Sequence, residues 1–168
     1  MELNDLEKIR LQKIHDLKAS GIEPFPTRTN VTHTTARAIA EFEKVEPDST
    51  PENPPHIKAT VGGRIRSARF MGKITFAHIE DGFGRLQLFM RVNDLGEEQM
   101  KFFSEMLDLG DFIEATGEMF RTRTGEITLR VESFRLLAKA LSPLPAAKDE
   151  VVDGEVIRHA AMTDPETR

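Results

Sequence analysis

The stretch from residue 58 to residue 91, KATVGGRIRSARFMGKITFAHIEDGFGRLQLFMR, decides the fold of this chain. It contains three runs of alternating apolar and polar residues, separated by turns at Met71-Gly72 and at Asp81-Gly82-Phe83-Gly84. Alternation with a period of two places successive side chains on opposite faces of a strand. The pair Gly62-Gly63 lacks Cβ atoms and predicts a bend within the first run. We therefore expect three consecutive antiparallel strands.

A helix and two further strands are expected after this stretch. In order, they are a helix at about 95–107, a strand at 112–121, a turn at Arg123-Thr124-Gly125 and a strand at 126–137. The spacing of Met100, Phe103 and Leu107 predicts that the apolar side of the helix faces the core. Asp94 stands at the cap position of this helix, with Glu97 at the spacing of a capping box.

The order of these elements favours an OB-fold. Three strands, a helix and a final hairpin match the layout of the five-stranded OB barrel, although other small β domains share this order. We expect a mainly β domain of this kind over residues 57–140. OB-folds bind oligonucleotides on the face of strands 2 and 3, so a binding site is to be sought there.

A helical extension is expected ahead of the barrel, over residues 1–56. The apolar residues that share one arc at the helical period are Leu3, Leu6, Ile14 and Leu17. They predict a helix over residues 3–19 that ends at Gly21. A second helix is expected over residues 34–44, capped by Thr32 or Thr34, with a proline-rich loop after it. Residues 141–168 have no strong core pattern and are expected to form a linker.

The charge of the chain is unevenly distributed. Its net value of −5 argues against a binder that relies on general positive charge. Residues 58–75, however, hold five basic side chains and no acidic one, whereas residues 41–52 hold five acidic side chains and one basic one. The five are Lys58, Arg64, Arg66, Arg69 and Lys73. This strip predicts a local contact with phosphate groups, unless these residues are only the solvated positions of a strand.

The usual signs of an enzyme are absent from the sequence. There is no cysteine, and none of the five histidines has a metal-ligand spacing to another histidine or to a carboxylate pair. The nucleophile-elbow, P-loop and dinucleotide-binding motifs do not occur. The adjacent carboxylates Glu80-Asp81 are better explained as the entry to a turn. We therefore expect no catalytic, cofactor-binding or metal-binding residue in this chain.

The sequence predicts neither a membrane span nor a signal peptide. No run approaches about 18 apolar residues, the length that marks a spanning helix. The N-terminus MELNDLEKIR is charged and lacks the apolar centre of a signal peptide. A cytoplasmic protein without a membrane partner is the expectation, and the absence of cysteine is compatible with it.

Strands 2 and 3 are expected to present an aromatic ring and an amide on one face. With Ala77 and Ile79 in the core, Phe76 points outward, and the same alternation on the third strand points Gln87 outward. An exposed ring can stack on an unpaired base, and an amide can read a base edge. The competing interpretation is that Phe76 lies in a strand buried on both sides and that Gln87 is merely solvated.

Three long stretches carry a family resemblance. They are RLQKIHDLKASGIEPFP at 10–26, VGGRIRSARFMGKITFAHIEDGFGRLQLFMRVNDLGEE at 61–98 and LDLGDFIEATGEMFRTRTGEITLRVESFRLLAKALSPLP at 107–145. With their M-G-K turn, T-x-T-G-E hairpin and L-x-P-L-P exit, they resemble the N-terminal anticodon-binding domain of bacterial class II lysyl-tRNA synthetases. Aspartyl- and asparaginyl-tRNA synthetases share the fold but usually lack the first two features together.

This resemblance implies that the domain reads the central uridine of an anticodon. On the family pattern, Phe76 stacks on this base, Gln87 bonds its edge and Arg69 contacts it. Glu126, in the T-x-T-G-E hairpin, is then near the neighbouring anticodon base. Arg69 fits the alternation only if a bulge or strand end follows Ser67. The basic residues expected to hold phosphates nearby are Arg64, Arg66 and Lys73.

The resemblance also implies a longer parent protein, a dimeric lysine–tRNA ligase that binds lysine tRNA. Its ATP, Mg²⁺ and lysine would be held by a catalytic domain absent from these 168 residues, so this chain alone is expected to be inactive. The alternative is a generic single-strand-binding OB protein, which predicts several stacking aromatics and a basic chain. The net charge and the single outward Phe76 disfavour it. Dimer contacts through the N-terminal helix and barrel are compatible with the first interpretation.

Overall fold

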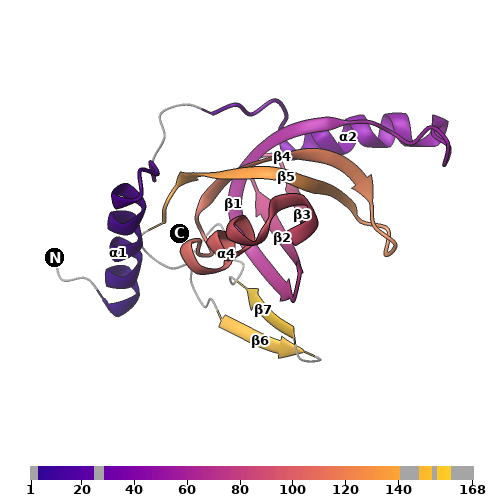
Figure 1. The fold of residues 1–168 in the computed structure, drawn as a ribbon. Coiled ribbons are helices and arrows are strands. Elements are labelled where there is room, and N and C mark those ends of the chain that lie inside the picture. The colour runs from indigo at the N-terminus through magenta and orange to yellow at the C-terminus, as the bar shows by residue number, and fades with distance from the viewer. Residues whose placement is uncertain (1–3, 25–28, 141–147, 153–154, 160–168) are drawn as a thin grey trace, which may run out of the picture.

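A closed β-barrel forms the centre of the molecule (Figure 1). The computed structural model describes residues 4–24, 29–140, 148–152 and 155–159, the last two ranges as backbone. The barrel strands are β1 (Lys58–Met71), β2 (Ile74–Glu80), β3 (Arg85–Arg91), β4 (Phe112–Arg121) and β5 (Ile127–Ala138). They lie where the alternation of the sequence predicts them.

The barrel closes because β1 pairs with two other strands. Its first half, from Lys58 to Arg64, is antiparallel to β4, and its second half, from Arg64 to Met71, is antiparallel to β2. The β2–β3 and β4–β5 pairs are also antiparallel, whereas β3 and β5 are parallel. Five strands in this order, with helices between β3 and β4, confirm the predicted OB-fold.

The core is made by the inward side chains of the strands and one helix. Its largest fully buried members in the barrel are Val61, Ile65, Ile79, Leu86, Leu88, Met90, Ile113, Met119, Leu129 and Val131. Phe103 and Leu107 are buried against them, and Met100 packs on the cluster, as the helical spacing predicted. The predicted inward faces of β2 and β3 are therefore confirmed.

β1 contains a bulge close to its middle. The register with β2 shifts between Ile65 and Ser67, so Arg66 is the extra residue. The glycine pair, where a bend is expected from the sequence, lies next to the point at which β1 changes its partner strand from β4 to β2. A Cβ atom at Gly63 would lie 3.0 Å from the carbonyl oxygen of Glu80, so glycine is needed there for close approach of the β2 backbone.

Two helices precede the barrel, α1 (Asp5–Ala19) and α2 (Thr35–Val45), and they lie on different sides of it (Figure 1). The side chains of Asn4 and Thr34 cap them by accepting backbone N–H groups three residues ahead. Gly21 ends α1 with a φ of 80°, as predicted. After α2, the proline-rich segment forms the short 3₁₀ helix η1 (Glu46–Asp48) and a bridge between residues 50 and 53.

The side of α1 that packs on the barrel differs from the predicted one. Ile14 and Leu17 are buried as expected, but Leu6 is 55% exposed, and Leu3 lies outside the described residues. One turn after Leu6, the buried position is taken by Arg10. The polar partners of this arginine at the end of the barrel explain why a charged residue occupies the stripe.

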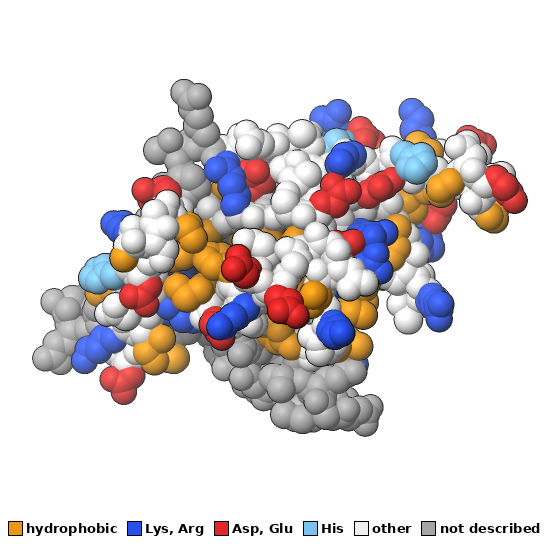
Figure 2. Space-filling model, in the orientation of Figure 1, with side chains coloured by type: hydrophobic (Ala, Val, Ile, Leu, Met, Phe, Trp, Pro, Cys, Tyr) orange, Lys and Arg blue, Asp and Glu red, His pale blue; other side chains and the backbone are white. Residues whose placement is uncertain are grey.

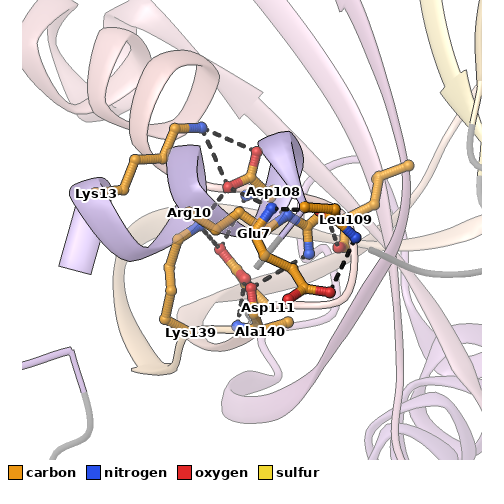
Figure 3. A network of polar contacts seen from close by, with 9 residues as sticks. Glu7, Arg10, Lys13, Asp108, Leu109, Asp111, Lys139 and Ala140 are labelled. Atoms are coloured by element: carbon orange, nitrogen blue, oxygen red, sulfur yellow. Dashed lines mark hydrogen bonds and ion pairs between the residues drawn. The ribbon is translucent and has the colours of Figure 1, made fainter. Parts of the chain in front are cut away.

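These partners form a buried network of charges that attaches α1 to the barrel (Figure 3). Lys139 Nζ, just after β5, donates to Asp108 at 2.6 Å and to Asp111 at 2.5 Å. From α1, Lys13 Nζ donates to Asp108 at 2.9 Å, and the Arg10 guanidinium donates to two backbone carbonyl oxygens. Lys139 and Asp111 have fully buried side chains, so each depends on the other for compensation of its charge.

The helix expected at about 95–107 is divided into α3 (Val92–Leu95) and α4 (Glu97–Met106). Gly96, with a φ of 86°, lies between them and is the N-cap of α4. The predicted capping box of Asp94 and Glu97 is therefore wrong. The Asp94 carboxylate accepts hydrogen bonds from Arg91 and Arg130 instead, and such charge-assisted bonds are stronger than a bond to a neutral backbone N–H.

The segment expected to be a linker contains two strands, β6 (Lys148–Val152) and β7 (Glu155–His159). They are antiparallel, and the β7 backbone pairs with β1 between Ser67 and Phe70. The short apolar runs of this segment gave no clear alternation, so its pairing with β1 was missed. The β6–β7 hairpin extends the sheet beside the second half of β1 (Figure 1).

Candidate nucleic-acid interface

The outward sides of β1, β2, β3 and β5 form one continuous face, in which residues stand in two rows across the strands. The first row holds Ser67, His78, Gln87 and Thr128, and the second holds Arg69, Phe76, Phe89 and Arg130. We call this surface the outward face. Arg69, Phe76 and Gln87, which the family resemblance assigned to one base, lie on three adjacent strands of it.

Arg69 belongs to the outward face because of the bulge at Arg66. Simple alternation from Ile65 would turn Arg69 toward the core, but the extra residue reverses the phase. Ala68 is accordingly buried and Arg69 is exposed. An irregularity was expected after Ser67. The structure has it just before this residue, with the required effect on Arg69.

Three phenylalanine rings cross the outward face as an aromatic ladder, formed by Phe76, Phe89 and Phe120. The ring centroids of Phe76 and Phe89 are 5.2 Å apart, and those of Phe89 and Phe120 are 5.7 Å apart. The sequence interpretation included only Phe76, although alternation on β3 had already turned Phe89 outward. The structure therefore corrects two expectations. Three rings point outward and not one, and each of them is half-buried instead of exposed.

Gln87 points away from the barrel core as predicted, but it is not solvated. Its residue is only 8% exposed, and its register partners are His78 on β2 and Thr128 on β5. Within residues 4–24 and 29–140, no side-chain hydrogen bond satisfies its amide. Its amide nitrogen and oxygen are not among the fully buried polar atoms that lack a partner in this part of the chain, so they reach the outward surface and are open to a ligand.

Glu126 is connected to the outward face through His78. The imidazole Nε2 lies 3.1 Å from Glu126 Oε1, and Nδ1 lies 3.2 Å from Ser67 Oγ. Because a carboxylate only accepts, Nε2 donates to it, and in the neutral ring Nδ1 accepts from the Ser67 hydroxyl. Sequence reasoning did not select His78, although it follows Phe76 by two residues on the same strand face.

The three residues expected to hold phosphates are not gathered together. The Arg64 guanidinium lies 4.8 Å from the centre of the Phe112 ring, and Arg66 Nε lies 3.9 Å from a Glu80 carboxylate oxygen. Lys73 is exposed in the turn between β1 and β2. Figure 2 shows acidic and basic side chains mixed over one side of the molecule, without a broad field of one sign.

A groove adjoins the outward face where β3 and β4 meet the proline-rich segment. It has a volume of about 950 Å³. Phe89 and Phe120 line it from the barrel, and Pro51, Pro54 and Pro55 line it from the other side. The aromatic ladder therefore leads from the outward face into a groove.

Asp94 organises two arginines of the same region. Its carboxylate accepts from Arg91 Nε at 2.8 Å and from Arg130 Nη2 at 2.8 Å. Both arginines line the groove. The hydrogen bonds from Arg130 and Arg91, which outweigh the effect of burial, lower the pKa of Asp94 to about 2.

We expect Asp94→Asn to lower the free energy of unfolding by about 1–2 kcal/mol at pH 7, and by less as the pH falls. Since the Asp94 pKa is depressed in the folded state, its stabilisation is complete above the unfolded value near 3.9 and is lost as the pH falls through about 2. Urea unfolding followed by circular dichroism at pH 7 and pH 3 tests this. A difference that is the same at both pH values, or equal to that of the exposed control Asp48→Asn, would contradict it.

The structure offers no assembled metal centre in the part whose side chains are described. Within residues 4–24 and 29–140, no three His, Asp or Glu side chains gather in a way that could hold an ion. No helix in those ranges is long and apolar enough to cross a membrane.

The fold and the outward face define an OB-fold nucleic-acid-binding domain. Comparison with known proteins agrees, because residues 59–137 match the family described as the OB-fold nucleic acid binding domain. The chain is 44% identical over 144 residues to a lysine–tRNA ligase of Pelotomaculum thermopropionicum. This match covers 86% of this chain and 26% of that protein. It is 41% identical over 145 residues to the lysine–tRNA ligase of Clostridium tetani, covering 86% and 27%.

A third relative is the lysine–tRNA ligase of Chloroflexus aurantiacus, to which the chain is 44% identical over 146 residues. This match covers 86% of this chain and 28% of that protein. The chain belongs to the bacterial lysyl-tRNA synthetase family, as its N-terminal anticodon-binding OB domain. It spans little more than a quarter of the length of these relatives.

Proposed function

We propose that this chain reads the central uridine of the lysine anticodon. The observation that supports this most strongly is the Gln87 amide, which lacks a side-chain hydrogen-bond partner within residues 4–24 and 29–140 and still reaches the outward surface of a largely buried residue. It lies on the outward face of an OB barrel, on the strand next to the half-buried ring of Phe76. A ring for stacking beside an unsatisfied amide is what recognition of one unpaired base requires.

Each residue has a distinct part in this proposal. Phe76 stacks on the uracil ring, and the Gln87 amide, which both donates and accepts, bonds its edge. Arg69 supplies only donors, so it can bond a carbonyl oxygen of uracil but not the amino group that cytosine carries at the same ring position. Glu126, held by His78, is near the neighbouring base of the anticodon.

The activity of the longer protein is part of the same proposal. As a lysine–tRNA ligase, it would use ATP and Mg²⁺ to join lysine to its tRNA in a catalytic domain, acting as a homodimer in the cytoplasm. The present chain would hold the anticodon loop and so select the tRNA, without taking part in the chemical step.

The test is binding of a labelled anticodon stem-loop of lysine tRNA at fixed salt. The label is carried by the RNA because the chain has neither tryptophan nor tyrosine. We expect Phe76→Ala, and separately a cytidine in place of the central uridine, to weaken binding by about 1–3 kcal/mol each. Phe83→Ala is the matched control, because Phe83 is a 72% exposed ring at the tip of the β2–β3 turn, outside both rows.

Equal binding of the two loops by the wild-type chain would refute the specific reader and favour a generic single-strand-binding OB protein. The aromatic ladder supports that second candidate, since such proteins stack several bases. The net charge of −5 weighs against it, because sequence-tolerant binders depend on positively charged grooves. A neutral effect of Phe76→Ala in a folded protein would remove Phe76 from the site in either case.

A further inference from the structure

We infer that Arg121 is a positioning residue for anticodon reading. Together with Glu46 it holds the β4–β5 hairpin in place, and so fixes the backbone from which Glu126 reaches the RNA. This inference rests on the proposed function and adds to it a role for the helical extension, which supplies Glu46. Arg121 ends β4 and Glu46 begins the 3₁₀ helix η1, so the contact joins the extension to the hairpin.

The Arg121 guanidinium binds two segments of the chain at once. Its Nε and Nη2 atoms donate to the two carboxylate oxygens of Glu46, both at 2.8 Å. Its Nη1 atom donates to the carbonyl oxygen of Gly125 at 2.7 Å. A bidentate pair of this kind fixes the plane of the guanidinium, and therefore also the direction in which the third nitrogen donates.

The Gly125 carbonyl group is held at the point where it controls the backbone of Glu126. It belongs to the peptide unit that leads into Glu126, and the N–H group of this unit donates to Thr122 Oγ1 at 3.1 Å. The carbonyl oxygen of Glu126 accepts the Thr122 N–H group at 2.9 Å. Thr122 lies in the same hairpin, so its bonds shape the turn locally. Arg121 adds the attachment to Glu46, which lies outside the hairpin.

Glu46 is itself anchored to the core of the molecule. Its backbone N–H group donates to the carbonyl oxygen of Phe42, whose side chain is buried in the core cluster. The hydrogen bond from Arg121 lowers the pKa of Glu46 below its ordinary value, so this carboxylate is charged at neutral pH. The hairpin is therefore tied to the core through the extension, separately from the bond between the Glu126 side chain and His78.

A positioning role accounts for the Arg121–Glu46 pair better than two other roles. The pair is partly exposed, and exposed ion pairs contribute little to the stability of a fold. A direct contact with an RNA phosphate would need donors that are turned to solvent, whereas each of the three Arg121 nitrogens already donates within the protein.

The test measures base discrimination by this chain. Arg121→Met and Glu46→Gln are titrated with the native stem-loop and with two loops in which one base beside the central uridine is replaced. Discrimination is the Kd for an altered loop divided by the Kd for the native loop, and Glu126→Ala identifies the altered loop that Glu126 senses. For that loop, we expect Arg121→Met and Glu46→Gln to lower the ratio by between about 3-fold and about 30-fold.

Three comparisons make the test specific to positioning. Adding Arg121→Met to Glu126→Ala should not lower the ratio further, because Arg121 acts through Glu126. Arg121→Lys keeps the charge but loses the planar fork, so it should retain only part of the discrimination. Arg37→Met is the matched control and should leave the ratio unchanged, because it removes an exposed arginine that pairs with Glu41 on α2.

Each other outcome overturns the inference. A wild-type ratio for Arg121→Met in a protein with the wild-type circular dichroism would show that Arg121 does not set the hairpin. Equal weakening of every loop with a shallower salt dependence would make Arg121 a phosphate contact instead. If Glu126→Ala lowers neither ratio, Arg121 has no reading residue to position. The proposed function is judged separately, by Phe76→Ala and by the loop with a central cytidine.

Discussion

Replacing Lys139 with methionine is expected to lower the free energy of unfolding by about 3–5 kcal/mol at neutral pH. The Lys139 side chain is fully buried and donates to two carboxylates, of which Asp111 is also fully buried. Methionine fills a similar volume without a charge. The expected loss therefore measures the cost of a buried carboxylate whose countercharge has been removed, and not the cost of a cavity.

The two carboxylates differ in their protonation. Burial raises the pKa of Asp111, although Lys139 opposes this, whereas around Asp108 burial is outweighed by Lys139 and Lys13, which lower the pKa. Without Lys139, protonation becomes the easiest way for Asp111 to avoid a buried charge. A carboxyl group whose pKa is raised in the folded state stabilises that state at low pH. The loss of unfolding free energy caused by Lys139→Met should therefore shrink as the pH is lowered from 7 toward 5.

Two further variants make this expectation specific. Lys13→Met removes a partly exposed partner of Asp108 and should cost less than about 1 kcal/mol. Adding Asp111→Asn to Lys139→Met removes the uncompensated charge and should recover part of the lost stability. Urea unfolding followed by circular dichroism measures all three. A wild-type midpoint for Lys139→Met, or no recovery in the double variant, would show that the pair does not hold this end of the barrel.

The sequence was sufficient for the barrel because its signals are local. Leu86, Leu88 and Met90 alternate within one strand, Asp81 accepts the backbone N–H groups of its own turn, and Gly125 supplies a φ of 94° at the last hairpin. Each signal depends only on neighbouring residues. The face that carries Phe76 and Gln87 follows directly from these strands.

The remaining features depend on contacts between distant residues. Arg10, Asp111 and Lys139 are far apart in sequence, and nothing in their immediate neighbours distinguishes a buried ion pair from solvated charges. Asp94 has the spacing of a helix cap, but Arg130 reaches it from β5 and binds the carboxylate more strongly. A local rule fails where a tertiary partner competes with it.

The aromatic ladder was missed for the same reason. Phe120 is outward on β4 and Phe89 is outward on β3, and only the parallel pairing of β3 with β5 brings these strands close enough for the rings to meet. The bulge at Arg66, unlike the ladder, was expected from the sequence, because Arg69 can point outward only if the alternation of β1 is interrupted before it. Its position could not be derived without the register of β1 on β2.

Gly117→Ala is expected to lower the free energy of unfolding by about 3 kcal/mol or more. The added methyl group would clash with backbone atoms, which move less easily than the flexible end of a side chain, so the cost lies at the upper end for overpacking. The register of β4 on β5 shifts between Thr116 and Gly117. At this point a Cβ atom on residue 117 would lie 2.7 Å from the carbonyl carbon of Arg130 and would overlap its oxygen. The backbone of β5 would have to move away.

Such a movement would disturb the outward face as well as the core. Arg130 stands in register with Phe89, the middle ring of the aromatic ladder, and its guanidinium binds Asp94. Displacement of β5 should therefore weaken stem-loop binding by the fraction of Gly117→Ala that remains folded. Gly82→Ala is the matched control, because a Cβ atom there meets nothing within 4 Å. Urea unfolding and RNA titration of both variants test this prediction. Equal stability of the two variants would mean that β4 and β5 can separate without cost. Normal RNA binding by a destabilised Gly117→Ala would mean that the aromatic ladder does not depend on the position of β5.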